Sequence, residues 1–294
     1  MKELDHRFAT ALRNLSDAPP ALAEALRQFN EISEAPDALI FSPAFSTMDL
    51  HRPASLLALT RTHWAIAINS KVPAGQPADQ EGSADLISAF ASPFTQTPAV
   101  ELSILLLDGR MAVHGGGNSS TALVIYFNTV MEKMYRDVVF FALEQMTAKA
   151  DGIGEEIPDS PRSPKPSLSM KFHSAIERFT PPGRTVHSYA AWPAVFGGFH
   201  RRLSPAAMLV RTQSELILIS DEPPSGGLFQ DPQQNLGYVV TYMPLQHIRG
   251  VELGAAGRLA ALEINLTAGQ ISESIVALVP AESAAAAVQV ARAG

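Results

Sequence analysis

The sequence has no cysteine and no long apolar run, and only 17% of its residues are charged. Without cysteine, a chain has no disulfides, no thiolate nucleophile and no cysteine-ligated zinc or iron–sulfur site. None of the apolar runs approaches the roughly 18–20 residues that a membrane-spanning helix needs. Residues 1–6 also lack the apolar core of a signal peptide. These absences together predict a cytoplasmic protein.

The chain also lacks an excess of basic residues, since its formal net charge is −7. Basic and acidic residues balance in 168–294, so the excess acid lies within 1–167. A nucleic-acid binder needs a positive field to hold the phosphate backbone. The composition therefore predicts no nucleic-acid partner, while a hydrophobic content of 46% is typical of a folded globular protein.

What the chain does contain is an internal repeat. Residues 53–68 and 205–220 align without a gap at a shift of 152 positions, through Pro-Ala, an apolar triplet and a shared threonine. Residues 93–102 align with 244–253 at a shift of 151, and both of these segments end in Val-Glu-Leu. Two blocks that keep nearly the same shift indicate that one domain is present twice.

Periodicity predicts the local structure of both copies. Apolar residues at helical spacing predict a helix over residues 3–15 and a second helix that starts near Asp17. Short strands separated by turn residues follow in each copy, and Asp108 with Gly109 is typical of a hairpin turn. A closing helix is expected from Thr129 in the first copy and over the Ala-rich C-terminal segment in the second.

These patterns divide the chain into four segments. The Pro- and Ser-rich composition of the middle predicts an extended linker, because such a stretch cannot pack as a core. The four segments are N-terminal helices that pack on the first domain (1–35), the first domain (36–147), the linker (148–168) and the second domain (169–294).

Both copies resemble the bacterial pleckstrin-homology-like (PH-like) domains. The resemblance rests on residues 57–68 with 93–102, and on the corresponding residues 209–219 with 244–253. The second copy is the better match, since Pro98 stands where a strand of the first copy should begin. The resemblance implies an α+β, mostly β fold of two PH-like domains. Each would be a small bent antiparallel sheet or open barrel of about seven strands, closed by a C-terminal helix.

The same resemblance implies a binding or assembly scaffold without shared catalytic residues. His114 and the three glycines after it are similar to the oxyanion-hole segment of some lipases, but the sequence has no Gly-x-Ser-x-Gly motif. This stretch also lacks the Gly-Lys-Ser/Thr ending of a phosphate-binding loop. The eight histidines are scattered without the spacing of a metal site. We therefore predict no enzyme, no cofactor and no metal, with an unrecognised hydrolase as a second alternative.

One basic cluster is a candidate ligand site. His200, Arg201 and Arg202 fall in the turn between the first two strands of the second domain, and Arg211 follows nine residues later. Arginine forks hold phosphate oxygens in pairs, and the corresponding turn of eukaryotic PH domains often carries basic residues. A solvated loop is the favoured interpretation of these residues, and a domain without net charge is only weakly attracted to an anionic membrane.

The favoured hypothesis is a non-catalytic protein that binds a protein partner or itself, through sheet edges or helix faces. The alternative is peripheral binding of phospholipid or another anionic ligand through the loop of Arg201 and Arg202. The sequence leaves the identity of the partner and the oligomeric state open.

Overall fold

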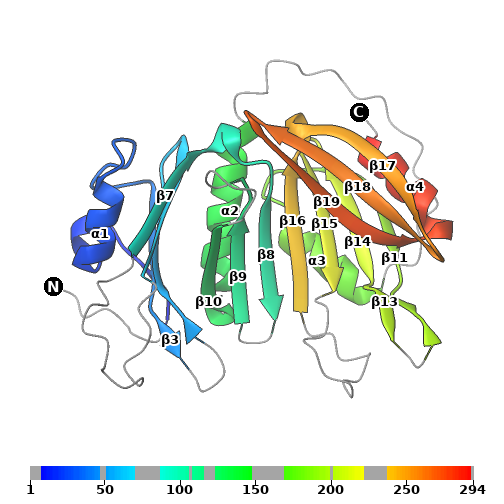
Figure 1. Cartoon of the computed structure of the whole chain (residues 1–294), viewed down its shortest axis with the longest axis horizontal. Helices are drawn as coiled ribbons and strands as arrows, with labels where there is room; N and C mark the ends of the chain where they lie inside the picture. Colours follow the sequence, from blue (N-terminus) through cyan, green and yellow to red (C-terminus); the bar gives the residue numbers. More distant parts are fainter. Residues whose placement is uncertain are drawn as a thin grey trace, which may run out of the picture.

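The computed structural model describes residues 8–46, 51–69, 87–105, 108–115, 123–147, 169–198, 201–221 and 237–292. Within these ranges the protein has an α+β, mostly β fold, and none of its antiparallel sheets closes into a barrel (Figure 1). The general class predicted from the sequence is thus confirmed. No helix in the described ranges is both long enough and apolar enough to cross a membrane.

The first half of the chain places one helix before its main strands and one after them. Its elements are β1 (Thr10–Ala11), a 3-10 helix (Leu15–Asp17), α1 (Pro20–Arg27), β2 (Ala38–Ser42), β3 (Phe45–Ser46), β4 (His51–Arg52), β5 (Ala54–Leu59), β6 (His63–Asn69), β7 (Ile87–Pro93), a 3-10 helix (Phe94–Gln96), β8 (Val100–Leu105), β9 (Asp108–Val113), β10 (Leu123–Asn128), a 3-10 helix (Thr129–Met131) and α2 (Glu132–Thr147).

The second half follows the same plan. Its elements are α3 (Met170–Phe179), β11 (Val186–Trp192), β12 (Val195–Phe196), β13 (Arg202–Ser204), β14 (Ala207–Thr212), β15 (Glu215–Asp221), β16 (Gly237–Pro244), a 3-10 helix (Leu245–His247), β17 (Ile248–Ala256), β18 (Leu259–Ala268), β19 (Ile271–Pro280) and α4 (Ala281–Arg292).

The main described elements of the two halves correspond, and β1 is the one described strand without a counterpart in the described part of the second half. A leading helix (α1 or α3) precedes four main strands (β2-β5-β6-β7 or β11-β14-β15-β16), a 3-10 turn, three strands (β8-β9-β10 or β17-β18-β19) and a closing helix (α2 or α4). The register also repeats, because Ser55 lies opposite Ile68 as Ala207 lies opposite Ser220. The sequence repeat is therefore matched by a repeat in structure.

The threonine shared by the two sequence blocks closes the same turn in both halves. Thr60 Oγ1 accepts a hydrogen bond from the backbone N–H of His63 at 3.1 Å. Thr212 Oγ1 accepts the corresponding bond from the N–H of Glu215 at 2.9 Å. A threonine hydroxyl that bonds to nearby backbone in this way stabilises a tight turn. The repeat thus extends from whole elements to single side chains.

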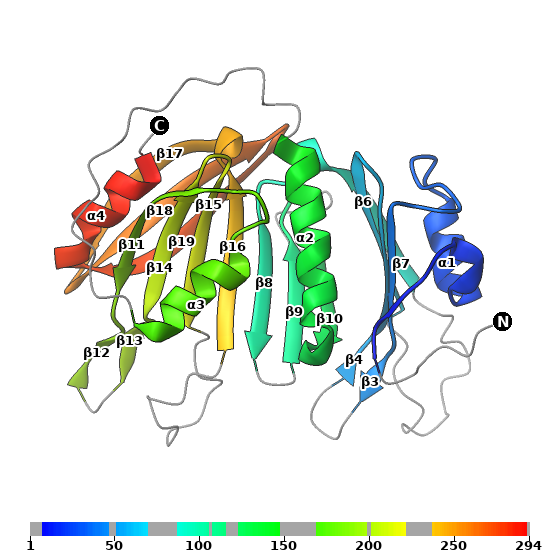
Figure 2. The same cartoon turned by 180° about the vertical axis from the view of Figure 1, so that it is seen from behind.

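One of the two large sheets is built from both halves. The first sheet has the strand order β1-β2-β5-β6-β7, and the second has the order β10-β9-β8-β16-β15-β14-β11. In the second sheet β8 of the first half pairs antiparallel with β16 of the second half. Three strands of one half and four of the other therefore form a continuous sheet across the molecule (Figures 1 and 2).

Buried side chains form three clusters around these sheets. α1 covers one face of the five-stranded sheet, where Leu22 and Leu26 share a cluster with Leu56. α2 lies in the middle of the molecule (Figure 2), in a cluster that includes Trp64 from the first half and Tyr242 from the second. α4 packs against β11, β14 and the three-stranded sheet β17-β18-β19. The central cluster therefore joins the two halves into one core.

The helix predicted over residues 3–15 is wrong for its described part. Thr10 and Ala11 form β1, and Thr10 lies opposite Phe41 of β2. An unpaired strand edge leaves a row of backbone donors and acceptors open, and β1 supplies partners for them. This tertiary pairing outweighs the helical spacing of Phe8, Leu12 and the leucine that follows.

Asp108 and Gly109 do not form the predicted turn but belong to β9. The glycine is required there by packing, because a Cβ on Gly109 would come 2.2 Å from the ring of Phe127 in β10. The expected linker at 148–168 lies outside the described residues. The closing helices α2 and α4 lie where the sequence predicts them.

Candidate functional site

The predicted basic cluster is divided between surface and interior. His200 lies outside the described residues, and Arg201 is exposed. The largely buried Arg202 side chain lies 3.6 Å from the carboxylate of Asp221. Burial lowers the pKa of the Arg202 guanidinium, and the charge of Asp221 opposes that shift. Arg202 is therefore engaged in an internal ion pair.

Arg211 lies at the other end of β14 from this ion pair. The start of the strand at Ala207 and Arg211 are four residues apart, which is roughly 13 Å along a strand. Arg211 is buried, and its Nη1 donates a hydrogen bond to the carbonyl of Ala291 in the last turn of α4, at 3.3 Å. A cation at this end of a helix is stabilised by the helix dipole. The structure thus does not bring Arg202 and Arg211 together into one phosphate clamp.

The glycine-rich stretch begins at a contact between the halves. His114 Nδ1 lies 2.5 Å from Glu273 Oε1 of β19, and both side chains are largely buried. Gly116 and Gly117 lie outside the described residues. Across the ranges that the structure describes, no group of three or more histidines and carboxylates could hold a metal ion. His114 therefore acts as a polar contact that ties the end of β9 to the second half.

A strand joint connects the two halves along β8 and β16. The pairing runs from Tyr242 opposite Val100 to Gly237 opposite Leu105. At Gly237 the backbones approach closely, since a Cβ there would come 2.5 Å from the carbonyl oxygen of Ile104. A side chain at this position would force the strands apart. The joint is therefore a close antiparallel pairing of two strands that belong to different halves of the chain.

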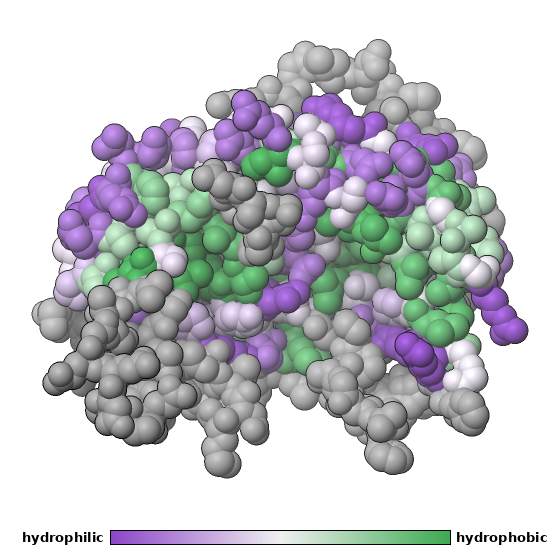
Figure 3. All heavy atoms as spheres, viewed as in Figure 1, coloured by the Kyte–Doolittle hydropathy of each residue, from purple (hydrophilic) through white to green (hydrophobic). Residues whose placement is uncertain are grey.

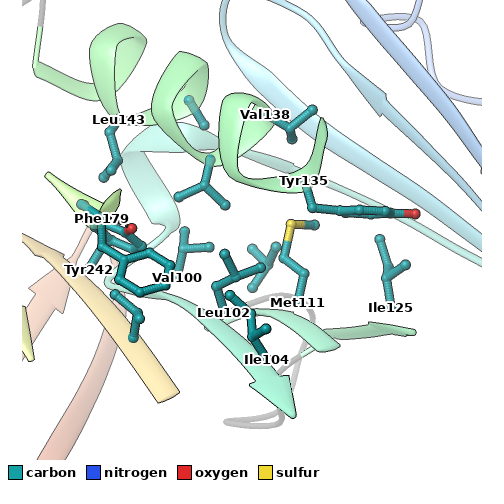
Figure 4. Close-up of a cluster of buried hydrophobic side chains, with 14 of the residues drawn as sticks. Val100, Leu102, Ile104, Met111, Ile125, Tyr135, Val138, Leu143, Phe179 and Tyr242 are labelled. Carbon is teal, nitrogen blue, oxygen red and sulfur yellow. Dashed lines mark hydrogen bonds between the residues drawn. The ribbon is translucent and has the colours of Figure 1, made fainter. Parts of the chain in front are cut away.

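Tyr242 anchors this joint in the central core. It is fully buried, and its hydroxyl donates a hydrogen bond to the carbonyl of Phe179 at 3.0 Å. Its ring meets the ring of Phe140 edge to face, with centroids 6.1 Å apart. Figure 4 shows Tyr242 beside Phe179 and close to Val100, under α2. Burial also raises the pKa of the Tyr242 hydroxyl, so the group stays neutral and donates its proton.

The second half has a groove along β17. The groove has a volume of about 510 Å³ and lies between the start of β17, the end of β14 and the end of α4. Arg211, Arg249 and Arg292 line it together with Glu252. Arg292 Nη2 donates a hydrogen bond to the carbonyl of Val251 at 2.5 Å. The groove thus combines a strand edge with positive charge.

A second groove, with a volume of about 620 Å³, lies between β1-β2 and α2. Apolar side chains such as Leu39, Met134 and Phe141 dominate its lining. Lys133 and Asp137, which also line it, pair with each other at 2.6 Å. This groove offers apolar contact without a set of converging polar groups.

Arg211 is the one residue of the β17 groove among the candidate site residues predicted from the sequence. Arg211, Arg249 and Arg292 lie far apart in the chain and form no local motif, so only the fold brings them together. The internal alignment did contain a usable signal, because it marks Glu252 as the counterpart of Glu101. Glu101 pairs with an arginine of β9 beside the joint, and Glu252 accepts a hydrogen bond from an asparagine of β18 at 3.4 Å.

Comparison of the chain with protein-family models, with curated proteins and with solved structures finds no match. The internal repeat, the joint between the halves and the groove along β17 are therefore the observations from which a function is inferred.

Proposed function

We propose that the protein is a non-catalytic binding and assembly protein built from two PH-like domains. The strand joint carries the proposal, because the first half binds the second along the edge of β8. Adding a strand to an open sheet edge is a recurrent way in which domains recognise protein partners. The order of four strands, three strands and a closing helix in each half supports the PH-like assignment.

The proposed domains keep the boundaries expected from the sequence, with PH-like units over 36–147 and 169–294. The partner is a protein, either another chain or a second copy. Composition alone supports a cytoplasmic protein without a nucleic-acid partner.

The anionic-ligand alternative rests on Arg201, because Arg202 and Arg211 have internal partners. Co-sedimentation with liposomes that contain anionic lipid tests it. Arg201→Glu should abolish binding if the loop holds a phosphate, and unchanged binding rejects the alternative. Glu101 and the other described carboxylates offer no observation that favours a hydrolase.

Pull-down followed by reconstitution tests the proposed function. The purified chain serves as bait, each captured protein is purified, and saturable binding is measured with the two pure components. Sedimentation velocity of the chain alone measures self-association in parallel. The proposal expects a saturable complex in at least one of these experiments. A chain that stays monomeric and binds no purified candidate overturns it.

A further inference from the structure

The joint between the halves uses one strand edge from each copy, and the repeat supplies each edge twice. At the shift of 151, β8 corresponds to β17 and β16 corresponds to β7. β8 and β16 pair with each other inside the chain. Among the described strands, β7 ends the five-stranded sheet and β17 ends the three-stranded sheet, each with a partner on one side only. The molecule therefore keeps an open copy of both edges that form its own joint.

The residues of β17 that correspond to the pairing residues of β8 direct their backbone N–H and C=O groups to the open side of the strand. The β17–β18 hairpin closes with Ala256 opposite Leu259, around a turn in which Gly257 has φ +68°. Successive residues of an antiparallel strand direct their N–H and C=O groups alternately to the two sides. This alternation directs Leu253 and Val251 away from β18. The carbonyl of Val251 accepts a hydrogen bond from Arg292 of α4, which agrees with that direction, and a strand that pairs along this edge would displace the Arg292 side chain from that carbonyl.

The open edge of β7 is oriented in the same way. The N–H of Phe94, just after β7, donates to the carbonyl of Thr62, as the N–H of Leu245 donates to that of Ser214 after β16. From this shared starting point, the alternation directs the backbone of Ala89 away from β6. β7 also carries no charged residue, whereas exposed edges are ordinarily protected by charge.

Burial differs between the filled edge and the open one. Leu102 of β8 is 0% exposed, and its counterpart Leu253 of β17 is 47% exposed. On the face shown in Figure 3, apolar side chains gather over the sheet that ends in β7 and again over β17-β18-β19. Val276 and Leu278 are among the exposed apolar residues of the latter sheet. The open edges thus expose surface that the internal joint buries.

The groove along β17 occupies the position of the repeat at which, in the internal joint, an aromatic pair is packed. In the first half, Phe140 of α2 meets the ring of Tyr242. At the same shift, Ala291 of α4 replaces Phe140, and this smaller residue lines the groove with Arg249 and Arg292.

We propose that β17 of one molecule pairs with β7 of a second copy of this chain, antiparallel and in the register of the β8–β16 joint. This inference rests on the proposed assembly function and names its partner. In that register Leu253 lies opposite Ala89, and Val251 lies opposite Ala91. The contact joins different surfaces of the two molecules, so it produces a head-to-tail chain or a closed ring. Figure 1 shows β7 and β17 toward opposite ends of the molecule, as such an arrangement requires.

The contact between molecules is weaker than the joint inside the chain. Ala91 replaces Tyr242, and Ala291 replaces Phe140, so the aromatic anchor is missing. Aromatic pairs contribute more than their buried area alone. Assembly should therefore depend on protein concentration, whereas the internal joint does not.

Sedimentation velocity with two edge variants tests the proposal. Leu253→Pro removes an N–H from the open side of β17, and Ala89→Pro does the same for β7; proline is tolerated on that side of an edge strand. Over a roughly hundredfold range of concentration, the wild type should form species larger than a monomer. Each variant alone should stay monomeric. An equimolar mixture should form a 1:1 dimer that grows no further, because the mixture contains one open β7 and one open β17.

Controls separate loss of the edge from loss of the fold. Val276→Lys changes an exposed apolar residue outside both edges and should assemble like the wild type. Leu253→Lys and Ser88→Lys place a charge on each edge without a proline and should also stay monomeric. Fluorescence of the buried Trp64 and Trp192 reports whether each variant is folded.

Three results overturn the proposal. They are a folded Leu253→Pro variant that assembles like the wild type, a mixture of the two proline variants that stays monomeric, and a wild type that stays monomeric throughout. In the third case, saturable binding of a purified partner leaves the proposed function standing. If that binding is absent too, both ideas fail.

Discussion

Leu102 and Leu253 allow the joint to be tested by stability alone. They occupy the same position of the repeat, but Leu102 is 0% exposed and Leu253 is 47% exposed. At Leu102, the strand β16 and the core around α2 cover the side chain. Truncation to alanine should therefore cost much more at 102 than at 253.

The magnitude follows from the groups removed. Leu→Ala removes three carbon groups, worth about 0.8 kcal/mol each when they are fully buried. At Leu102 the closed core also retains a cavity, which brings the expected loss of unfolding free energy to about 3–4 kcal/mol. At Leu253 roughly half of the transfer free energy is lost and no closed cavity forms, so the expected loss is about 1 kcal/mol.

Urea unfolding followed by tryptophan fluorescence measures both losses. Trp64 belongs to the first half and Trp192 to the second, and both are buried. The protein concentration must be low enough for the wild type to be monomeric, so that association does not add to the stability. Equal losses for the two variants, or a larger loss at Leu253, would refute the conclusion that the joint buries this position in one copy only.

Three further predictions concern buried groups. Burial raises the pKa of Glu215 despite its hydrogen bond from Thr212 and the charge of Arg184. Below the pKa of the unfolded chain, the carboxyl group is protonated in both the folded and the unfolded state. As the pH rises above that value, the unfolded chain loses the proton first, so the stability of the wild type falls. Glu215→Gln should therefore gain stability relative to wild type as the pH rises above the unfolded pKa of about 4.3, and urea midpoints that keep a constant difference would contradict this. Gly237→Ala should cost about 1–3 kcal/mol in urea unfolding, because its Cβ meets a carbonyl of β8; an unchanged midpoint argues against that close approach. Tyr242→Phe should cost about 1 kcal/mol in the same assay by removing its buried hydrogen bond, and a neutral effect would mean that the bond contributes nothing.

The basic cluster shows the limit of local reasoning about a site. His200, Arg201 and Arg202 are adjacent in the sequence and Arg211 is near them, so the sequence predicts one cluster. In the structure Arg202 precedes the six-residue strand β14, and Arg211 lies near the end of that strand. Because a strand is extended, Arg202 and Arg211 have different partners at its two ends, Asp221 and Ala291. Proximity along a chain predicts proximity in space only within a turn or a helix.

Predictions of single elements differ for a similar reason. The helix at Glu132–Thr147 is predicted correctly because its apolar stripe and its length are properties of one segment. The strand at Thr10–Ala11 is missed because its hydrogen bonds depend on β2, which lies later in the chain. The turn predicted at Gly109 is wrong because the glycine is needed there to leave room for the ring of Phe127 and does not form a turn.

The amino-acid pattern alone establishes that one unit occurs twice, and it identifies the strand after Pro93 with the strand after Pro244. It can do so because alternating apolar residues and a turn threonine act locally, and the same local pattern folds in the same way twice. Which strand edges are filled is a property of the complete fold. Backbone donors and acceptors are alike in every strand, so the choice of β16 as the partner of β8 depends on the core that Tyr242 enters. That core exists only when both halves are folded together, and among the described strands it leaves β7 and β17 with a partner on one side only.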